Sequence, residues 1–554
     1  MHNRREFLKK SAIGFTAALG LGVFSCSKKQ AEPPNVLFII CDDLNDSIEG
    51  LGGHPQAKTP NLDKFRRASV QFTNAHSNDP ICGPSRASLL TGIYPHESGY
   101  FGYNQQQNRW RDNPTLKDAQ TFMEHFAANG YKVYGSGKIF HNDHEDWSVW
   151  KNGFGIKPTF GPVAWDGNFW KESPVRGTHD HDMGLAHPAV TEDCPEIDKK
   201  LRWYNSFGSL ADVPEYPPIP EKDVPGFKGW MCFGKPFRYV SENNRDLMPD
   251  ELNAQYAAKI LEEKHKNPFL LCVGMNRPHT PLHAPQKYFD MHPLEEIELP
   301  PHLENDLADC AEALRSPSTT WTTDTGFEKF DLVKKCNNWK EWVQAYLACV
   351  SFVDDQIGKI LQSLENSSYA ENTMVIITSD HGYHMGEKEY IFKNTLWEES
   401  SRVPLFVKAP GTTKSASCNH PVSLIDLYPT MCDACDISED PNIKGNGKAL
   451  DGYSLLPFLE NPERNDWDGP EVALTAVGSN DPLEPNQPGE AGRQHYAIRS
   501  IRYRYILCNN GEEELYDHKN DPHEWHNLAD DPKYLQIKNN FNNRLKLLLA
   551  GKSF

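Results

Sequence analysis

Short, continuously apolar segments recur along the chain, separated by stretches in which apolar residues return every three or four positions. The first, residues 36–40, is uninterrupted and rich in β-branched residues, which is typical of a strand buried on both faces of a parallel sheet. Similar runs follow at 131–134, 269–273, 374–378 and 404–407. We therefore expect several buried strands that belong to one sheet.

Two of the intervening stretches predict helices. Residues 115–129 have a helical pattern and are followed by Gly130, a residue that commonly ends helices because it adopts left-handed backbone angles. Apolar residues between Trp339 and Leu364 recur at helical spacing and predict one long helix with a single apolar face. Strands that alternate with helices favour an α/β fold with a large, mostly parallel sheet flanked by helices.

Two regions depart from this alternation. From about residue 143 to 245 the periodicity fades and Gly, Pro, Trp, His and Asp dominate, which predicts a loop-rich insertion. Residues 496–507 alternate basic with apolar or aromatic side chains, as an antiparallel strand or hairpin does, and a final helical stretch follows. The sequence thus predicts a main domain over 35–440 and a smaller C-terminal α+β subdomain over 450–554.

The first 25 residues resemble an export signal. Arg4, Arg5, Lys9 and Lys10 form a basic start, and the uncharged residues 12–24 are too short a stretch to span a bilayer comfortably. Cys26 comes directly afterwards, as in bacterial lipoprotein signals, where this cysteine becomes the lipidated N-terminus. The stretch from Arg4 to Lys9 also resembles a twin-arginine signal. An ordinary cleaved signal with a chance cysteine is the alternative.

This signal predicts where the mature protein lies. We expect an exported lipoprotein in the periplasm, at the outer membrane or at the cell surface, with residues 26–34 as a polar tether to the lipid anchor.

Composition excludes some functional classes. The chain has 554 residues, of which 38% are hydrophobic, enough for a large core and too many for a disordered protein. Its formal net charge is 57 − 76 = −19, which disfavours binding to nucleic acid or to an anionic membrane surface. Thirteen cysteines are too few for a disulfide scaffold of this length. An anionic ligand would have to bind at a local group of cations.

Aspartates follow two of the predicted strands. Asp42 and Asp43 come after the first strand, and Asp380 follows the run at 374–378. Ligands of a doubly wound sheet gather beyond the carboxyl ends of its strands. Adjacent carboxylates repel each other unless a cation or hydrogen bonds stabilise them, so these three suit Ca²⁺ or Mg²⁺. A turn or a helix cap is the common alternative for an aspartate after a strand.

The most informative motif is CGPSRASLLTG at residues 82–92. Cys82 with Arg86 one helical turn later could be a thiolate of lowered pKa, or Pro84 and Gly92 could simply mark the two ends of a helix. Neither interpretation explains the whole string. It resembles the C-x-P-S-R-x-x-L-x-T-G signature of the type I sulfatases, members of the alkaline-phosphatase-like superfamily. In that family a maturase oxidises the cysteine to formylglycine.

The resemblance spans about residues 35–530, is weakest in the insertion, and implies an active site. The implied metal ligands, for one Ca²⁺ rather than Mg²⁺, are Asp42, Asp43, Asp380, His381 and the modified Cys82. The implied catalytic residues are Cys82 as nucleophile, Arg86, Lys393, His279 in RPHTP, and Lys138 and His141, which both lie in GKIFH at 137–141. His279 would protonate the leaving oxygen.

The implied function is removal of O-sulfate from a sulfated oligosaccharide, with the maturase as a protein partner and no nucleic acid. The stretches around His141 and His279 look most like iduronate-2-sulfatase-like enzymes, which tend to carry an arginine shortly after the paired aspartates. This chain has Asn45 and Asp46 there, so uronate, rhamnose and galactose polymers all stay open. The alternatives are a phosphatase or phosphodiesterase of the same superfamily and a glycan-binding lipoprotein with a decayed site.

Overall fold

The computed structural model describes residues 33–550, except 103–104, 106–109, 142–145, 169–171, 174–176, 179–183, 194–205, 316–321, 412–414, 439–440 and 442–448. The expected signal peptide at 1–25 and Cys26 lie outside the described residues. No helix in the part of the chain that is described is both long and apolar enough to cross a membrane.

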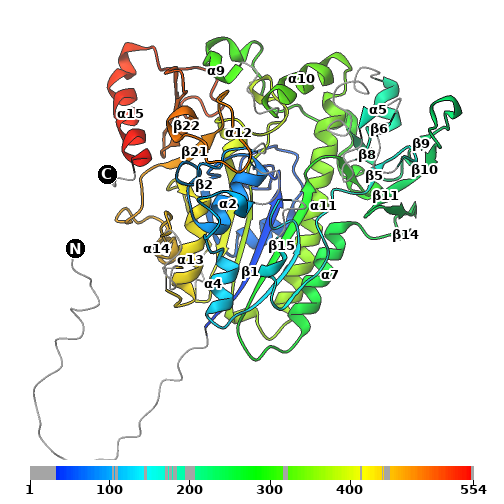
Figure 1. Ribbon diagram of the computed structural model, residues 1–554, viewed down its shortest axis with the longest axis horizontal. Helices are drawn as coiled ribbons and strands as arrows, with labels where there is room; N and C mark the ends of the chain where they lie inside the picture. The colour runs from blue at the N-terminus through cyan, green and yellow to red at the C-terminus, as the bar shows by residue number, and fades with distance from the viewer. Residues whose placement is uncertain are drawn as a thin grey trace, which may run out of the picture. The chain divides into compact units, whose positions relative to one another are not determined.

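A large mixed sheet forms the centre of the main domain (Figure 1). Its strands are ordered β19-β2-β18-β17-β1-β15-β3-β4, and β20 also pairs with β2. The strand bounds are β1 Asn35–Asp42, β2 Val70–His76, β3 Lys132–Gly137, β4 Gly153–Phe154, β15 Phe269–Pro278, β17 Thr373–Ser379, β18 Arg402–Lys408, β19 Ala416–Cys418 and β20 Val422–Ser423. β17, β1, β15, β3 and β4 are parallel, whereas β18 runs antiparallel to both β17 and β2.

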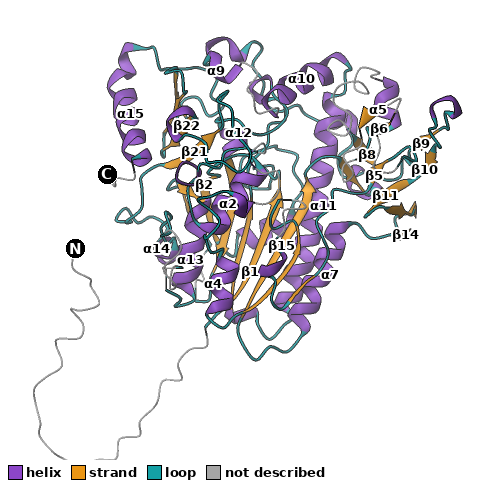
Figure 2. Ribbon diagram, in the orientation of Figure 1, coloured by secondary structure: helices purple, strands orange, loops and turns teal. Residues whose placement is uncertain are grey.

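Side chains of β1 alternate between two cores because successive residues of a strand point to opposite faces. Leu37 and Ile39 belong to the core on one face, and Phe38 and Ile40 to the core on the other. Figure 2 shows helices on both sides of the sheet. α7 (Pro249–Glu262) and α11 (Trp339–Glu365) cover the first face, and α2 (Cys82–Thr91), α4 (Phe122–Ala128) and α13 (Leu427–Ala434) cover the second.

The expected α/β fold is therefore confirmed, with two local differences. The predicted helix at 115–129 begins only at α4, because Thr121 ends the preceding turn and forms a capping box. Its hydroxyl accepts from the backbone N–H of Glu124, while the Glu124 carboxylate accepts from the backbone N–H of Thr121. Strand β2 was not predicted, because its sequence VQFTNAH mixes polar and apolar residues without a clear period.

Within its described residues, the region after β4 contains short strands, the short helix α5 and a 3-10 helix at Pro220–Lys222. Their bounds are β5 Val163–Ala164, β6 Glu172–Ser173, β7 Gly177–Thr178, α5 Pro188–Asp193, β8 Phe207–Ser209, β9 Glu215–Tyr216, β10 Phe227–Lys228, β11 Trp230–Cys232, β12 Lys235–Phe237, β13 Tyr239–Ser241 and β14 Asn244–Arg245. β12, β11 and β5 form a three-stranded sheet. β8 pairs with β16 (Leu282–Ala284), which ties this region to the segment after β15.

A four-stranded antiparallel sheet forms the C-terminal subdomain, as expected. Its strands, in order, are β21 Ala473–Val477, β22 His495–Arg499, β23 Tyr503–Leu507 and β24 Glu513–Asp517, and α15 (Leu535–Leu549) packs on β23. The other α-helices among the described residues are α1 Pro60–Arg66, α3 Pro95–Ser98, α8 Gln286–Phe289, α9 Glu312–Arg315, α10 Thr322–Lys335, α12 Glu398–Ser401 and α14 Leu456–Glu460.

Candidate active site

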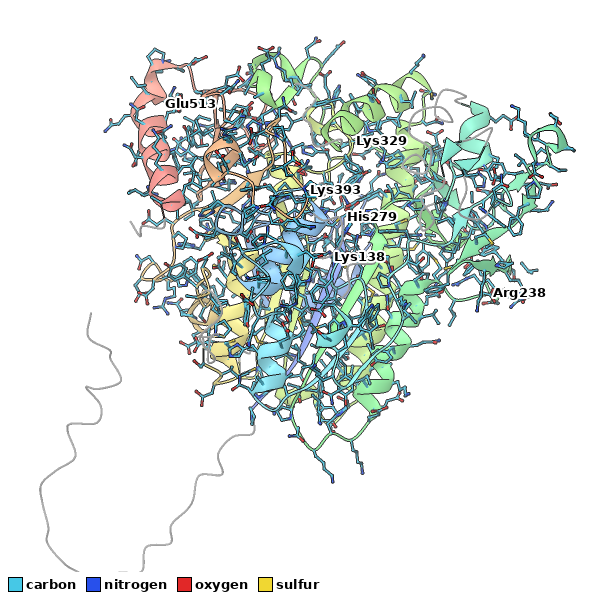
Figure 3. All side chains as sticks on the ribbon, in the orientation of Figure 1. Lys138, Arg238, His279, Lys329, Lys393 and Glu513 are labelled. Carbon is cyan, nitrogen blue, oxygen red and sulfur yellow. The ribbon has the colours of Figure 1, made fainter. Side chains whose placement is uncertain are left out.

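Four parallel strands and one helix bring the candidate residues together. The carboxyl ends of β1, β3, β15 and β17 lie at one edge of the sheet, where open α/β sheets bind ligands. Figure 3 shows the labelled side chains of Lys138, His279 and Lys393 in the same region at that edge. They come from segments far apart in the sequence: Lys138 directly follows β3 and His279 directly follows β15, whereas Lys393 lies in the loop between β17 and α12.

Cys82 is the first residue of α2 and is fully buried. Its Sγ lies 3.4 Å from Asp42 Oδ1, 3.2 Å from His381 Nε2 and 3.1 Å from Lys393 Nζ. Burial, together with the nearby Asp42 carboxylate, raises the pKa of the Cys82 thiol to about 12. The hypothesis that Cys82 is a thiolate of lowered pKa is therefore wrong for the unmodified residue. The helix interpretation is confirmed: residues 82–91 form α2, and Gly92 caps its end with left-handed backbone angles.

Three buried cations face three buried carboxylates around Cys82. Lys138 pairs with Asp42, Lys393 pairs with Asp43, and Arg86 Nε lies 2.9 Å from Asp380 Oδ2. Burial alone would raise the pKa of Asp42, but Lys138, His279 and Arg86 outweigh it and hold that pKa well below its usual range. Burial raises the pKa of Asp43 despite Lys393. The three positive charges thus offset the three carboxylates within the cluster.

The donor set of this cluster fits a hard divalent ion. Ligand atoms of Asp42, Cys82, Asp380 and His381 all lie within 4.8 Å of one another, and a second such group combines Asp42, Cys82, Asp43 and His279. Asp43 Oδ2 is buried and accepts no hydrogen bond within the described residues, so it has an unused lone pair for a cation. Carboxylate oxygens are the ligands that Ca²⁺ and Mg²⁺ prefer.

A third group of possible ligands does not fit a cation. Glu398, His518 and Glu524 lie close enough together. Arg499 and Arg504 already neutralise the two carboxylates, with Arg499 Nε 3.0 Å from Glu398 and Arg504 Nε 2.6 Å from Glu524. All four oxygens of these two carboxylates accept hydrogen bonds, so none is left for a metal ion. This differs from the group around Cys82, where Asp43 Oδ2 accepts no hydrogen bond from the described residues.

His279 is positioned by the end of β15. Its Nδ1 lies 2.6 Å from the carbonyl oxygen of Thr280, and because a carbonyl only accepts, Nδ1 donates and Nε2 faces the cluster. Nε2 is 3.9 Å from Asp43 Oδ2. Burial and the two nearby lysines hold the pKa of His279 well below its ordinary value.

The loop after β3 carries both Lys138 and His141. The Arg86 guanidinium donates to the carbonyls of Lys138 and Ile139, which ties this loop to α2. His141 lies half-buried two residues beyond Ile139. It is not among the described side chains that hydrogen-bond to Cys82.

Sequence reasoning missed two side chains at this site. Phe160, in the loop-rich insertion, stacks on the His279 ring at 4.4 Å between ring centroids. Lys329 of α10 is buried with its Nζ 3.7 Å from the Trp342 ring centroid and 3.3 Å from the Tyr383 hydroxyl, and burial lowers its pKa well below the ordinary value. Neither lies in a patterned motif, so nothing in the spacing of residues could have pointed to them.

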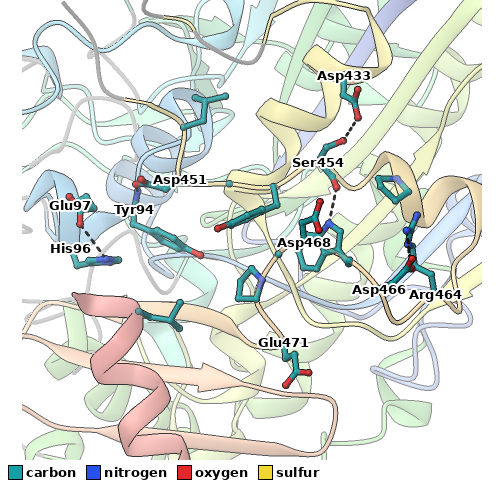
Figure 4. Close-up of a pocket in the computed structure, with 18 residues that line it drawn as sticks. Tyr94, His96, Glu97, Asp433, Asp451, Ser454, Arg464, Asp466, Asp468 and Glu471 are labelled. Carbon is teal, nitrogen blue, oxygen red and sulfur yellow. Dashed lines mark hydrogen bonds and ion pairs between the residues drawn. The ribbon is translucent and has the colours of Figure 1, made fainter. Parts of the chain in front are cut away.

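A separate cavity of about 810 Å³ lies near α3, α14 and α15 (Figure 4). None of the candidate active-site residues lines it. Its labelled acidic residues are Glu97, Asp433, Asp451, Asp466, Asp468 and Glu471. Such a wall would repel a sulfate group, so this cavity is not where a sulfate ester would react.

Comparisons with known proteins agree with the motif. A family model described as "Sulfatase" matches residues 34–437, and one described as "N-sulphoglucosamine sulphohydrolase, C-terminal" matches residues 386–550. A sulfatase of Formosa agariphila is 32% identical over 536 residues, covering 93% of this chain and 88% of that protein. An ulvan-active sulfatase of the same organism is 28% identical and covers 94% of this chain and 83% of that protein.

The fold is shared with solved structures. One of them, a protein in complex with its substrate D-glucosamine-2-N,6-O-disulfate, matches with a TM-score of 0.62 at 20% identity, covering 93% of this chain and 97% of that chain. A likeness at this identity shows a common fold.

Proposed function

The chain belongs to the sulfatase family of sulfuric ester hydrolases, and we propose that it removes O-sulfate from a sulfated carbohydrate through a formylglycine at position 82. The carbohydrate class is supported by two similar proteins, the ulvan-active sulfatase and the protein solved with a sulfated glucosamine. The observation that carries the proposal is the set of contacts that Cys82 makes with Asp42, His381 and Lys393.

The site suits an anionic ester. The oxygens of a sulfate monoester repel an incoming nucleophile, so a catalyst must neutralise them. Lys138, Lys393 and Arg86 supply three positive charges beside Cys82. Asp42, Asp43, Asp380 and His381 would hold a divalent ion, which we propose to be Ca²⁺ and which would supply Lewis-acid polarisation of a sulfate oxygen.

The modified residue explains how turnover is completed. Hydration of the aldehyde at position 82 gives two hydroxyl groups on one carbon. One hydroxyl gives its proton to Asp42, whose Oδ1 lies 3.4 Å from Sγ of residue 82, and its oxygen attacks sulfur as the bond from sulfur to the sugar oxygen breaks. The negative charge of the bound sulfate favours the doubly protonated form of His279, and this form donates its Nε2 proton to the sugar oxygen as it leaves. The second hydroxyl then gives up its proton, with His141 as the candidate base. The bond from carbon to the sulfated oxygen breaks, sulfate departs and the aldehyde reforms.

Unmodified Cys82 could not follow this route. Its thiol is protonated at neutral pH, because burial raises its pKa to about 12. A sulfated thiol would also lack the second hydroxyl that expels sulfate. We therefore propose that a formylglycine-generating maturase is a required partner.

The surroundings of Asn45 and Asp46 bear on the sugar. The Asn45 side-chain amide donates to the carbonyl of Tyr383, and Asp46 pairs with Arg402 at 3.0 Å. Neither side chain offers a positive charge to a substrate carboxylate. This favours a sugar that is recognised by something other than an arginine at this place, such as a sulfated rhamnose, galactose or glucosamine residue.

A panel of substrates tests the proposal. The protein, produced together with a maturase, is incubated with sulfated oligosaccharides derived from ulvan, glycosaminoglycan and carrageenan, and with matched phosphate esters, and released anion is measured by ion chromatography. We expect sulfate release from at least one oligosaccharide and none by Cys82→Ala. Phosphate release alone, or equal activity of Cys82→Ala, would contradict the proposal.

We also propose that Cys26 carries a lipid and that the protein acts outside the cytoplasm. The basic start, the short apolar stretch and the cysteine that follows it support this. Metabolic labelling with a fatty acid should mark the wild type and not Cys26→Ser. Labelling of both variants, or of neither, would overturn the lipid anchor.

A further inference from the structure

Phe160 joins two of the candidate catalytic side chains. It lies in the loop-rich insertion just before β5 and is 1% exposed. Its ring stacks on the His279 imidazole, with centroids 4.4 Å apart and planes inclined by 29°. The Lys138 ammonium lies 4.6 Å from the centre of the same ring. A single phenyl group therefore packs against the proposed leaving-group acid and against a cation of the sulfate site.

Arg277 holds the backbone of both stacked residues, Phe160 and His279. Its Nη2 donates to the carbonyl oxygen of Phe160 at 3.0 Å, and its Nη1 donates to the carbonyl oxygen of His279 at 3.3 Å. Its Nε donates to the carbonyl of His283 at 2.9 Å. One buried, planar guanidinium thus sets the relative position of the two backbone segments that carry the stacked rings.

Further contacts hold each segment in place. The Asp250 carboxylate accepts the backbone N–H groups of Asn276 and Arg277, at 2.8 and 2.9 Å, which anchors the turn before His279 to α7. On the other side, Gly161 packs so closely on β11 that an added Cβ would lie 2.8 Å from Cys232 Sγ. Phe160 therefore has little freedom to move away from His279.

We propose that Phe160, held by Arg277, is a positioning residue for the proton transfer to the leaving group. The hydrogen bond from Nδ1 to Thr280 fixes one edge of the His279 ring. The phenyl ring fixes its plane, and together they keep Nε2 directed at the place where the sugar oxygen leaves. This inference rests on the proposed function, because it assigns a role within that reaction.

The role predicts a dependence on the leaving group. A sugar oxygen leaves as a poor alkoxide and needs the proton from His279, whereas the phenolate of 4-nitrophenyl sulfate leaves without one. General acid catalysis contributes about 10²–10⁴-fold, and a misplaced catalytic group can lose about 10²-fold. Loss of the stack should therefore slow the sugar sulfate far more than the aryl sulfate.

The test compares Phe160→Leu with wild type, both matured, on the sulfated oligosaccharide and on 4-nitrophenyl sulfate. We expect kcat for the oligosaccharide to fall by about 10- to 100-fold, with KM little changed and the aryl sulfate rate within about threefold of wild type. Phe160→Tyr keeps an aromatic ring and should recover most of the lost rate. Phe154→Leu is the matched control, since Phe154 lies in the same insertion and packs on Trp147 and Trp150 rather than on His279.

The outcomes separate this inference from the function itself. An equal loss on both substrates, or no recovery in Phe160→Tyr, would overturn the positioning role and leave the sulfatase activity standing. A wild-type protein that hydrolyses neither ester would overturn the proposed function. Thermal unfolding shows whether Phe160→Leu folds; if it does not, Phe160→Met is read against the same criteria.

Discussion

Glu398 is a buried carboxylate at which the C-terminal sheet meets the loop that carries Lys393, and its replacement should destabilise the protein strongly. Its carboxylate lies 3.0 Å from Arg499 Nε and also pairs with Arg504, and its side chain is 10% exposed. Burial alone would raise the pKa of Glu398, but Arg499, His518 and Arg504 outweigh it and hold that pKa well below its usual range. The carboxylate is therefore charged at neutral pH.

The size of the effect follows from the charges. Arg499 and Arg504 are balanced by Glu398 and Glu524. Glu398→Ala leaves one buried positive charge without a partner, which costs about 3–5 kcal/mol of unfolding free energy. Urea unfolding followed by tryptophan fluorescence measures this loss. Adding Arg499→Met to Glu398→Ala should restore part of it, because the unpaired charge is then removed.

An exposed ion pair provides the control. Lys64 and Glu365 lie 2.9 Å apart, a similar distance, but their side chains are 67% and 51% exposed. Lys64→Ala should cost less than about 1 kcal/mol, because water screens such a pair. If Glu398→Ala lowers the free energy of unfolding by no more than Lys64→Ala does, then burial does not determine how much this ion-pair network contributes to stability.

Three further predictions concern the charged clusters. Asp380→Asn should lower Ca²⁺ affinity in titration calorimetry by at least about tenfold and abolish sulfate release; unchanged affinity would mean that the ion binds elsewhere. Lys393→Ala should lower kcat for sulfate release by about 10²–10³-fold, and a loss below tenfold would exclude it from charge stabilisation. Burial alone would raise the pKa of Glu524, but Arg504 and His518 lower it from 4.5 to about 2. The stability it contributes should be fully present above pH 4.5 and be lost as pH falls towards 2; Glu524→Gln should remove this part of the pH dependence of thermal unfolding.

The parallel centre of the sheet was predictable because its strands are buried on both faces. Residues 36–40 and 374–377 are all apolar, and both runs lie within central strands. β2 is a strand for a different reason. It pairs with β18 and β19 on either side, and this tertiary pairing stabilises a sequence whose own pattern is ambiguous.

The candidate site also contains residues that the sequence pattern predicts and residues that only tertiary contacts reveal. Asp42 and Asp380 were predictable because they lie at strand ends, which the topology brings to one edge of the sheet. Cys82 was predictable because it belongs to a long motif. Phe160 reaches His279 only through the fold of an insertion without periodicity, so its role depends on tertiary contacts. The same holds for Lys329, whose aromatic neighbours come from different elements.

The negative charge of the whole chain does not conflict with an anionic substrate. A net charge of −19 cannot attract a sulfated sugar over a long distance. The positive charge is local instead: Arg86, Lys138 and Lys393 are concentrated around one buried residue, and part of the acidity lies in the carboxylates that pair with them.

Mass spectrometry of the peptide that contains Cys82 shows directly whether residue 82 of the active protein is formylglycine. The peptide is taken from protein that has been shown to release sulfate, produced with a maturase, and from a matched preparation without one. We expect an aldehyde at position 82 in the active preparation, in proportion to its activity, and a thiol in the inactive one. Full sulfate release by protein in which residue 82 is entirely an unmodified cysteine would contradict this expectation.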